Sequence, residues 1–287
     1  MPDIAFLNGE FLPLNQACLP VTDYGFLFGD ALFETLRTYG GRFFRLEAHL
    51  DRLARSAALL EIPVDLTVLT GDILETARRS EFRDARLRCT LTPGSGKLVP
   101  DLTSCRAPTV LITAISHVPV PSAVYTTGWR AEISQICRDS HSLLPGLKTV
   151  SYLENLRARR SARSHGADEA LFLNEQGCLT ESSSANIFIF SDDRLQTPRV
   201  GCGVLPGVTR GVLLELATQL GIPWVETDLR PSELENATEA FLTNSFIEIV
   251  PLTGCDGKKI NAGRPGPVTL ALIQAYTGLV IRETARS

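Results

Sequence analysis

A proline-interrupted segment, His117–Ser122, divides this chain of 287 residues into two halves, each of which alternates between predicted strands and helices. Pro119 and Pro121 lack the N–H group that helices and sheet ladders both need, so neither kind of element continues through the segment. A chain of this length is also more typical of two domains than of one. We therefore expect an N-terminal α/β domain over residues 1–117, a linker over 118–123 and a C-terminal α/β domain over 124–287.

The spacing of apolar residues and the placement of prolines and glycines predict the main elements of both halves. Predicted strands cover residues 4–7, 86–92, 109–115, 169–173, 186–190 and 239–243. Predicted helices cover residues 46–61, 150–164 and 209–220. The turn Asn174–Gly177 is placed between the 169–173 and 186–190 strands. Mixed α/β structure is thus predicted for both halves.

The overall composition excludes several kinds of partner. Hydrophobic residues make up 44% and charged residues 21%, which is typical of a globular protein. A net charge of −4 disfavours nucleic acid and anionic membranes as partners. No apolar run approaches the roughly 20 residues that a membrane helix needs. The N-terminus lacks the features of a signal peptide, and the seven scattered cysteines form no C-x-x-C pair. We expect a cytoplasmic protein without a metal site.

Lys148 is the first candidate for chemistry, because only four of the 28 basic residues are lysines and this one follows the apolar turn Leu143–Leu147. Burial lowers the pKa of a lysine, and an amine tuned in this way attacks carbonyl groups and forms Schiff bases. A surface lysine beside a helix fits the same residues, and position alone does not decide between the two.

Two polar clusters could bind a phosphate group. Pro206–Arg210 lies where a turn opens a predicted helix, and the free N–H groups there, with the hydroxyl of Thr209, suit an anion. Thr243–Ser245 ends a predicted strand and could donate to the same group. An ordinary N-cap threonine and an ordinary turn are the alternatives.

Two charged side chains are harder to place. Glu181 precedes an apolar strand, where a carboxylate needs a cationic or hydrogen-bonding partner. A protonated pyridine nitrogen is one such partner, and a nearby arginine or a capping role is another. Arg52 lies off the apolar stripe of the predicted 46–61 helix, so periodicity alone predicts that it is exposed.

The order of these segments along the chain resembles that of the class IV aminotransferases. The resemblance covers nearly the whole chain and rests on seven segments, namely Asp23–Arg37, His49–Leu53, Gly146–Lys148, Glu169–Ala170, Glu181–Asn186, Pro206–Arg210 and Phe241–Ser245. The family includes branched-chain aminotransferases, D-amino-acid aminotransferases and 4-amino-4-deoxychorismate lyases. It implies fold type IV, similar to D-amino-acid aminotransferase, with pyridoxal 5'-phosphate between two α/β domains. Its members are usually homodimers whose active sites borrow a loop from the partner.

The resemblance also implies roles for single residues. Lys148 matches the Schiff-base lysine, Glu181 the carboxylate that keeps the pyridine nitrogen protonated, and Tyr152 a tyrosine that contacts the phenolic oxygen of the cofactor. Arg52 matches a phosphate-binding arginine, against the periodicity. The remaining cofactor-binding candidates are Asn186, Val208, Thr209 and Ser245. The substrate-binding candidates are Phe33, Thr35, Arg88 and Phe246.

The choice within the family rests on a few positions. The D-amino-acid enzymes bind the substrate carboxylate with a tyrosine and an arginine, where this chain has Phe33 and the pair Pro93–Gly94. Branched-chain enzymes usually have glycine where this chain has Thr35, and several lyases have threonine at about that point. The segment Phe241–Ser245 is also common among lyases. Tyr152 and Glu248 are more similar to transaminases.

We therefore expect a transaminase that moves an amino group between a branched-chain-like L-amino acid and a 2-oxo acid through a Schiff base on Lys148. The alternatives are a 4-amino-4-deoxychorismate lyase that releases pyruvate and 4-aminobenzoate, a D-amino-acid or (R)-amine transaminase, and a cofactor-binding protein without turnover. The residues do not identify the donor, the acceptor or the pathway.

Overall fold

The computed structural model describes residues 3–285, and contacts within the chain divide it into two compact units. The first unit contains the chain up to Val118, the segment Leu147–Ser151 and the residues from Val280 onward. The second contains Pro119–Gly146 and Tyr152–Leu279. Both units combine strands with helices, so the predicted α/β class is confirmed. The linker at residues 118–123 stays a prediction.

The first unit is built on an antiparallel sheet with the strand order β2-β1-β6-β5-β3-β4. Its strands are β1 (Ile4–Leu7), β2 (Glu10–Pro13), β3 (Leu32–Tyr39), β4 (Arg42–Phe43), β5 (Ala85–Thr92) and β6 (Thr109–Ser116). Its helices are α1 (Tyr24–Leu27), α2 (Leu46–Leu59) and α3 (Leu66–Ser80), with short 3₁₀ turns at Leu14–Gln16 and Leu102–Ser104. The three strands predicted in this half are thus confirmed as β1, β5 and β6.

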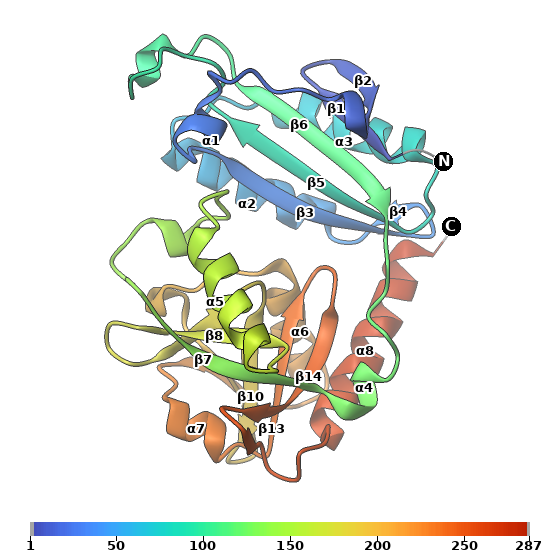
Figure 1. The fold of residues 1–287 in the computed structure, drawn as a ribbon. Coiled ribbons are helices and arrows are strands. Elements are labelled where there is room, and N and C mark those ends of the chain that lie inside the picture. Colours follow the sequence, from blue (N-terminus) through green and yellow to red (C-terminus); the bar gives the residue numbers. More distant parts are fainter. Residues whose placement is uncertain (1–2, 286–287) are drawn as a thin grey trace. The chain divides into compact units, whose positions relative to one another are not determined.

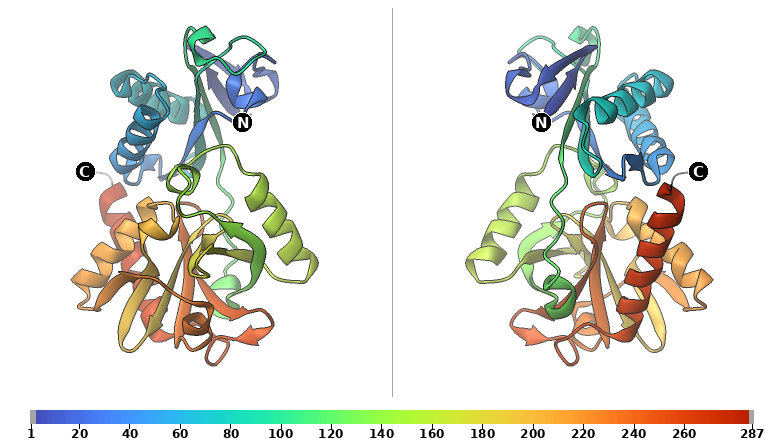
Figure 2. Two further views of the ribbon diagram at one scale, coloured as in Figure 1. Left: turned by 90° about the vertical axis from the view of Figure 1, so that its left-hand side faces the viewer. Right: turned by 90° about the vertical axis from the view of Figure 1, so that its right-hand side faces the viewer.

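Helices α2 and α3 cover one face of this sheet (Figures 1 and 2). Leu53 of α2 and Ile73 of α3 pack with Leu87 of β5 in one apolar core. Helix α2 ends at Leu59, two residues before the predicted end. Helix α3 then begins after Asp65, whose carboxylate accepts hydrogen bonds from the N–H groups of Thr67 and Val68. This shared core therefore determines which face of the sheet α2 covers.

The segment Leu147–Ser151 belongs to the first unit because it pairs with the beginning of β3. The N–H of Phe33 donates to the carbonyl of Lys148 (2.8 Å), and the N–H of Val150 donates to the carbonyl of Ala31 (3.0 Å). Leu147 is buried in the same core as α2 and α3. This pairing holds residues 149 and 150 in an extended form, so the helix predicted over 150–164 begins only at Leu153, and its first turn was predicted wrongly.

The second unit contains a sheet that closes on itself. Successive pairings run β10-β13-β14-β7-β8-β9, and β9 pairs again with β10, so that six strands form a ring. They are β7 (Trp129–Arg138), β8 (Glu169–Asn174), β9 (Leu179–Ser182), β10 (Asn186–Ser191), β13 (Glu239–Asn244) and β14 (Glu248–Cys255). Outside the ring, β11 (Arg194–Pro198) and β12 (Trp224–Thr227) extend from β10, and β15 (Lys258–Lys259) pairs with β14.

The second unit also contains most of the remaining helices. They are α4 (Val124–Thr127), α5 (Leu153–Ser164), α6 (Val208–Gln219) and α7 (Pro231–Glu235), and α8 (Pro267–Thr284) begins here, with 3₁₀ turns at Leu144–Gly146 and Val200–Cys202. Within residues 3–285, no helix is both long and apolar enough to cross a membrane. The predicted strands of this half are confirmed as β8, β10 and β13, and the predicted helix at 209–220 is confirmed as α6.

Strand β9 was missed by the sequence analysis. The turn Asn174–Gly177 connects β8 to β9 rather than to β10. Strand β9 is only four residues long and contains the polar residues Thr180, Glu181 and Ser182, so its apolar signal is weak. It turns directly into β10, where Glu181 lies opposite Asn186. The missed strand therefore sets the position of a predicted cofactor-binding residue.

Candidate functional site

Four of the predicted residues gather on one face of the first sheet. Side chains alternate along β3, so Phe33 and Thr35 share a face, and Thr35 pairs directly with Arg88 of β5. The guanidinium carbon of Arg88 lies 3.7 Å from the centroid of the Phe33 ring, and Nζ of Lys148 lies 4.5 Å from it. An aromatic side chain therefore adjoins both the candidate Schiff-base amine and a cation able to bind a carboxylate.

Glu34 points to the opposite face of β3, where it joins Arg52 and His49 of α2. Nε of Arg52 donates to Oε1 of Glu34 and Nη2 donates to Oε2, both at 2.7 Å. Nδ1 of His49 lies 2.8 Å from Oε2. All three side chains are buried. Arg52 is only 6% exposed, so the exposure predicted from periodicity is wrong, and the reason is the carboxylate that faces it across the core.

The charges in this group are balanced. Burial alone would raise the pKa of Glu34, but the charge of Arg52 and the hydrogen bonds from His49 and Arg52 together lower it to about 2. Burial lowers the pKa of His49 below its ordinary value, against the raising effect of Glu34. Near neutral pH, Glu34 is therefore ionised and His49 is uncharged. The negative charge of Glu34 is balanced by the positive charge of Arg52, and this ion pair orients the guanidinium.

Glu181 and Asn186 lie together in the second unit. Oε2 of Glu181 accepts a hydrogen bond from the N–H of Leu205 (3.1 Å) and one from Nδ2 of Asn186 (3.3 Å). Nδ2 of Asn186 also donates to the carbonyl of Leu205 (2.9 Å). The half-buried carboxylate is thus joined to the turn that leads into α6, and α6 carries the predicted residues Val208 and Thr209.

The N-terminus of α6 has the form of a phosphate site. Its N-cap is Gly207, which has no side chain to bond the first-turn N–H groups. A Cβ atom at Gly207 would overlap the side chain of Asn186, so the close approach of the two requires glycine. Thr209 is buried in the first turn. These features fit the phosphate group of pyridoxal 5'-phosphate, with backbone N–H groups and one hydroxyl as donors.

The turn between β9 and β10 joins three further predicted residues to this group. The carbonyl of Ser183 accepts a hydrogen bond from the hydroxyl of Tyr152 (3.1 Å), and the carbonyl of Ser184 accepts one from Nδ2 of Asn244 (2.9 Å). Oδ1 of Asn244 accepts from the N–H groups of Phe246 and Ile247. The short turn that contains Ser245 and Phe246 is therefore tied to the β9–β10 turn.

Sequence reasoning assigned no separate role to the residues that hold these candidates in place. Glu34 binds the predicted residue Arg52, and Asn155 binds the carbonyl of Ser183, yet neither was predicted as a site residue. Asn244, which accepts from the N–H of Phe246, lies in the predicted Thr243–Ser245 cluster but was given no role of its own. One signal could have identified Glu34: it occupies a position of an apolar strand whose side chain faces the core, and a buried carboxylate needs a cation. No comparable pattern marks Asn155, because single amides on a helix are common.

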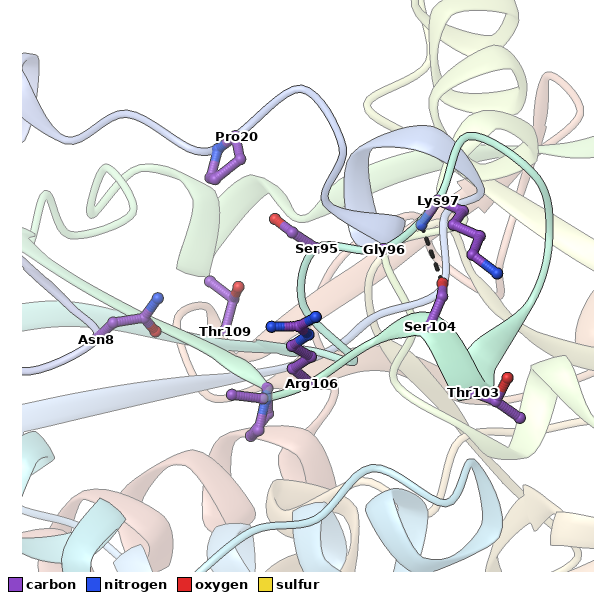
Figure 3. Close-up of a pocket in the computed structure, with 11 residues that line it drawn as sticks. Asn8, Pro20, Ser95, Gly96, Lys97, Thr103, Ser104, Arg106 and Thr109 are labelled. Carbon is purple, nitrogen blue, oxygen red and sulfur yellow. Dashed lines mark hydrogen bonds between the residues drawn. The ribbon is translucent and has the colours of Figure 1, made fainter.

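A cavity of about 710 Å³ lies elsewhere in the first unit, at the loop between β5 and β6 (Figure 3). Lys97, Ser104 and Arg106 line it, and the N–H of Lys97 donates to Oγ of Ser104 at 2.9 Å. None of the predicted site residues lines this cavity.

Across residues 3–285, histidine, cysteine and acidic side chains form no group of three that could hold a metal ion.

The chain is similar to known proteins over almost its whole length. The family described as amino-transferase class IV matches residues 31–255. A putative branched-chain-amino-acid aminotransferase of Methanocaldococcus jannaschii is 37% identical over 94% of both chains. A D-alanine aminotransferase of Bacillus licheniformis is 29% identical over 98% of both. The crystal structure of the Escherichia coli branched-chain amino acid aminotransferase has a TM-score of 0.93 and 28% identity, and the match covers 100% of this chain and 97% of that one.

These matches cover almost the whole chain at more than 25% identity. They confirm the fold-type IV architecture that the sequence predicted. The same comparison of structures includes a putative 4-amino-4-deoxychorismate lyase and a branched-chain enzyme with pyridoxamine 5'-phosphate. The chain therefore belongs to the class IV aminotransferases, enzymes of fold type IV that depend on pyridoxal 5'-phosphate.

Proposed function

We propose that this enzyme moves an amino group between an L-amino acid with a branched, apolar side chain and a 2-oxo acid. The arrangement around Phe33 carries the proposal: one aromatic ring adjoins the Lys148 amine and the Arg88 guanidinium. Phe33 is buried, so the ring makes the surroundings of the amine apolar, and Arg88, which is exposed, offers a partner for a carboxylate. The likeness to a putative branched-chain enzyme at 37% identity supports it.

The proposed roles follow the chemistry of each side chain. When bound, pyridoxal 5'-phosphate supplies an electron sink next to the reacting carbon. Lys148 binds the cofactor through Nζ and afterwards moves a proton at that atom. Glu181 holds a proton on the ring nitrogen, and Tyr152 contacts the phenolic oxygen. The proposed phosphate ligands are Arg52, Val208, Thr209 and Ser245, and Asn186 orients Glu181. Thr35 and Phe246 are the remaining proposed substrate-binding residues.

We further propose that the chain acts as a homodimer in the cytoplasm. Val21, Phe26 and Leu98 of the first unit are each about 70% exposed or more, although they are large and apolar. A second copy of the chain would remove such side chains from water, which stabilises association. All seven cysteines are free thiols, as a reducing compartment favours.

Substrate choice separates this proposal from its alternatives. Purified enzyme should convert L-leucine to its 2-oxo acid with 2-oxoglutarate as acceptor, and the rate with D-alanine should be at least tenfold lower. The physical reason is the absence of the tyrosine and arginine that bind the carboxylate of D-substrates, where this chain has Phe33 and Pro93–Gly94. Formation of 4-aminobenzoate and pyruvate from aminodeoxychorismate, without transfer from L-leucine, would identify the lyase instead.

Lys148 should carry the cofactor covalently, because the other three lysines, Lys97, Lys258 and Lys259, have exposed side chains that pair or lie at the surface. Borohydride reduction followed by peptide mass mapping should place the pyridoxyl group on Lys148. Lys148→Ala should lose nearly all turnover, and Lys97→Ala should keep the parent rate. A pyridoxyl group on any of the other three lysines contradicts the assignment.

Arg52 should act mainly in cofactor retention, since charge-assisted hydrogen bonds to phosphate are stronger than neutral ones. Arg52→Ala should raise the cofactor dissociation constant at least tenfold, and excess cofactor should restore part of the activity. The variant should also be less stable, because Glu34 loses its main counter-charge. Arg78→Ala on the exposed face of α3 is the control. Unchanged cofactor affinity would mean that Arg52 only compensates Glu34.

Glu181→Gln should bind cofactor but react slowly. The amide keeps the shape and can still accept from the Leu205 N–H, but it removes the charge that stabilises a protonated ring nitrogen. We expect the half-reaction with the L-amino acid to slow at least about a hundredfold, equivalent to ~2.7 kcal/mol, measured by stopped-flow absorbance of the cofactor. Glu235→Gln, at an exposed ion pair, should react at the parent rate. A parent rate for Glu181→Gln means that this carboxylate does not face the nitrogen.

A further inference from the structure

One buried carboxylate, Glu169, binds both serine hydroxyls of the turn between β9 and β10. Glu169 is the first residue of β8 and is fully buried. Its Oε1 accepts hydrogen bonds from Oγ of Ser183 and from the N–H of Ala170 (2.9 Å), and its Oε2 accepts one from Oγ of Ser184 (3.0 Å). Three donors thus converge on one acceptor-only group. Glu169 belongs to a segment that resembles the family, but it has no role in the proposed function.

The backbone of the same two serines holds residues of the proposed site. The carbonyl of Ser183 accepts from the hydroxyl of Tyr152 and from Nδ2 of Asn155 (2.8 Å). The carbonyl of Ser184 accepts from Nδ2 of Asn244. Each serine therefore binds Glu169 with its side chain and a site element with its carbonyl oxygen. The position of the carboxylate consequently determines where both carbonyl groups lie.

The second of these links reaches the turn around Ser245. Asn244 donates to Ser184 and accepts from the N–H groups of Phe246 (2.8 Å) and Ile247 (2.9 Å). An asparagine used in this way fixes the backbone of the two residues that follow it. The chain of contacts from Glu169 through Ser184 to Asn244 thus ends at the backbone on either side of Ser245.

We propose that Glu169 is a positioning residue, which holds the Ser183–Ser184 turn so that Tyr152 and Ser245 are placed for the cofactor. The inference rests on the proposed function of those two residues. Without the carboxylate, the hydroxyl of the buried Ser183 loses its acceptor, and the turn shifts to find another. Glu169 itself need not touch the cofactor or the substrate.

Glu239 offers a matched control within the same unit. It is the first residue of β13 and is also buried, and it accepts three hydrogen bonds, from the N–H groups of Val268 and Thr269 and from the hydroxyl of Thr269. Its partners lie at the start of α8, and no contact with the β9–β10 turn is among its hydrogen bonds. Glu169 and Glu239 thus share burial and number of donors but differ in what they hold.

The experiment compares Glu169→Ala, Glu169→Gln and Glu239→Ala. In the cofactor-free protein, Glu169→Ala should speed amide hydrogen exchange at Phe246 and Ile247 at least tenfold, and it should raise the dissociation constant of pyridoxal 5'-phosphate about tenfold, equivalent to ~1.4 kcal/mol. Glu169→Gln keeps one oxygen and the side-chain shape, so it should restore most of both. Glu239→Ala should lower the melting temperature to a similar extent, with exchange at residues 246–247 and cofactor affinity within twofold of the parent.

A double-variant cycle tests the link to Tyr152. If Glu169 acts through Tyr152 and Ser245, the two substitutions should not act independently. Relative to the parent, the double variant Glu169→Ala, Tyr152→Phe should then raise the cofactor dissociation constant by less than the product of the two single fold-changes. Equal losses of affinity in Glu169→Ala and Glu239→Ala would overturn the proposal, because the effect would then follow stability alone. If Glu169→Ala does not fold, Ser184→Ala provides the same test: unchanged exchange at Phe246 and Ile247 would overturn the proposal.

Failure of the proposed function is seen separately. It would appear in the parent enzyme, as an absence of amino transfer from L-leucine. Failure of the role of Glu169 would appear in the comparison of variants, in hydrogen exchange without cofactor and in cofactor affinity, neither of which requires amino transfer.

Discussion

The pairing of the short strand β9 with β8 on one side and β10 on the other is the interaction on which the second unit depends. It closes six strands into a ring. Only residues 183–185 lie between β9 and β10, so the chain reverses within three residues. Glu181 precedes that reversal and Asn186 follows it. The same geometry that removes a sheet edge therefore brings two polar side chains together beside the turn that opens α6.

Buried carboxylates support both units, but they are compensated in different ways. Glu34 faces the guanidinium of Arg52 and the ring of His49, and its pKa falls to about 2. Glu169 has no ion pair among its hydrogen bonds and is satisfied by two hydroxyls and one N–H group. An ion pair fixes the direction of one long side chain, whereas a set of short donors fixes a backbone turn. Each arrangement suits what it holds, namely an arginine in one unit and a tight reversal in the other.

The sequence predicted the regular parts of the fold better than the supports of the site. Long apolar strands such as β5 and β6 have a clear periodic signal, and α2 and α6 begin and end close to their predicted bounds. Strand β9 was missed because pairing on both edges, rather than apolar content, stabilises it. Residues 150–152 were predicted helical because a local pattern does not show that Val150 bonds to Ala31, more than a hundred residues earlier.

Arg52 illustrates the limit of periodicity for site residues. Hydrophobic spacing assigns charged positions to solvent, and it has no term for a carboxylate placed opposite them. The resemblance to a family uses the identity of residues in order along the chain rather than their local environment, so it gives Arg52 a role where periodicity predicts only exposure. It does not mark Asn155, whose importance lies in the carbonyl group of Ser183 that it binds. Such residues emerge only when hydrogen bonds are followed from a candidate to the groups that hold it.

The position of Phe33 connects the alternation of side chains along β3 with the proposed substrate site. In an extended strand, neighbouring side chains point to opposite faces, so the sequence Phe33-Glu34-Thr35 sends an aromatic ring and a carboxylate in opposite directions. The carboxylate is used within the core, for Arg52. The ring is left on the face with Lys148 and Arg88, two cations that share one aromatic partner. A guanidinium can pair with a carboxylate, and the ring beside it contributes only apolar surface to its surroundings. The alternation along β3 thus places an apolar group and a cation side by side, and a ligand with an apolar side chain and a carboxylate, such as the proposed branched-chain amino acid, suits that pair.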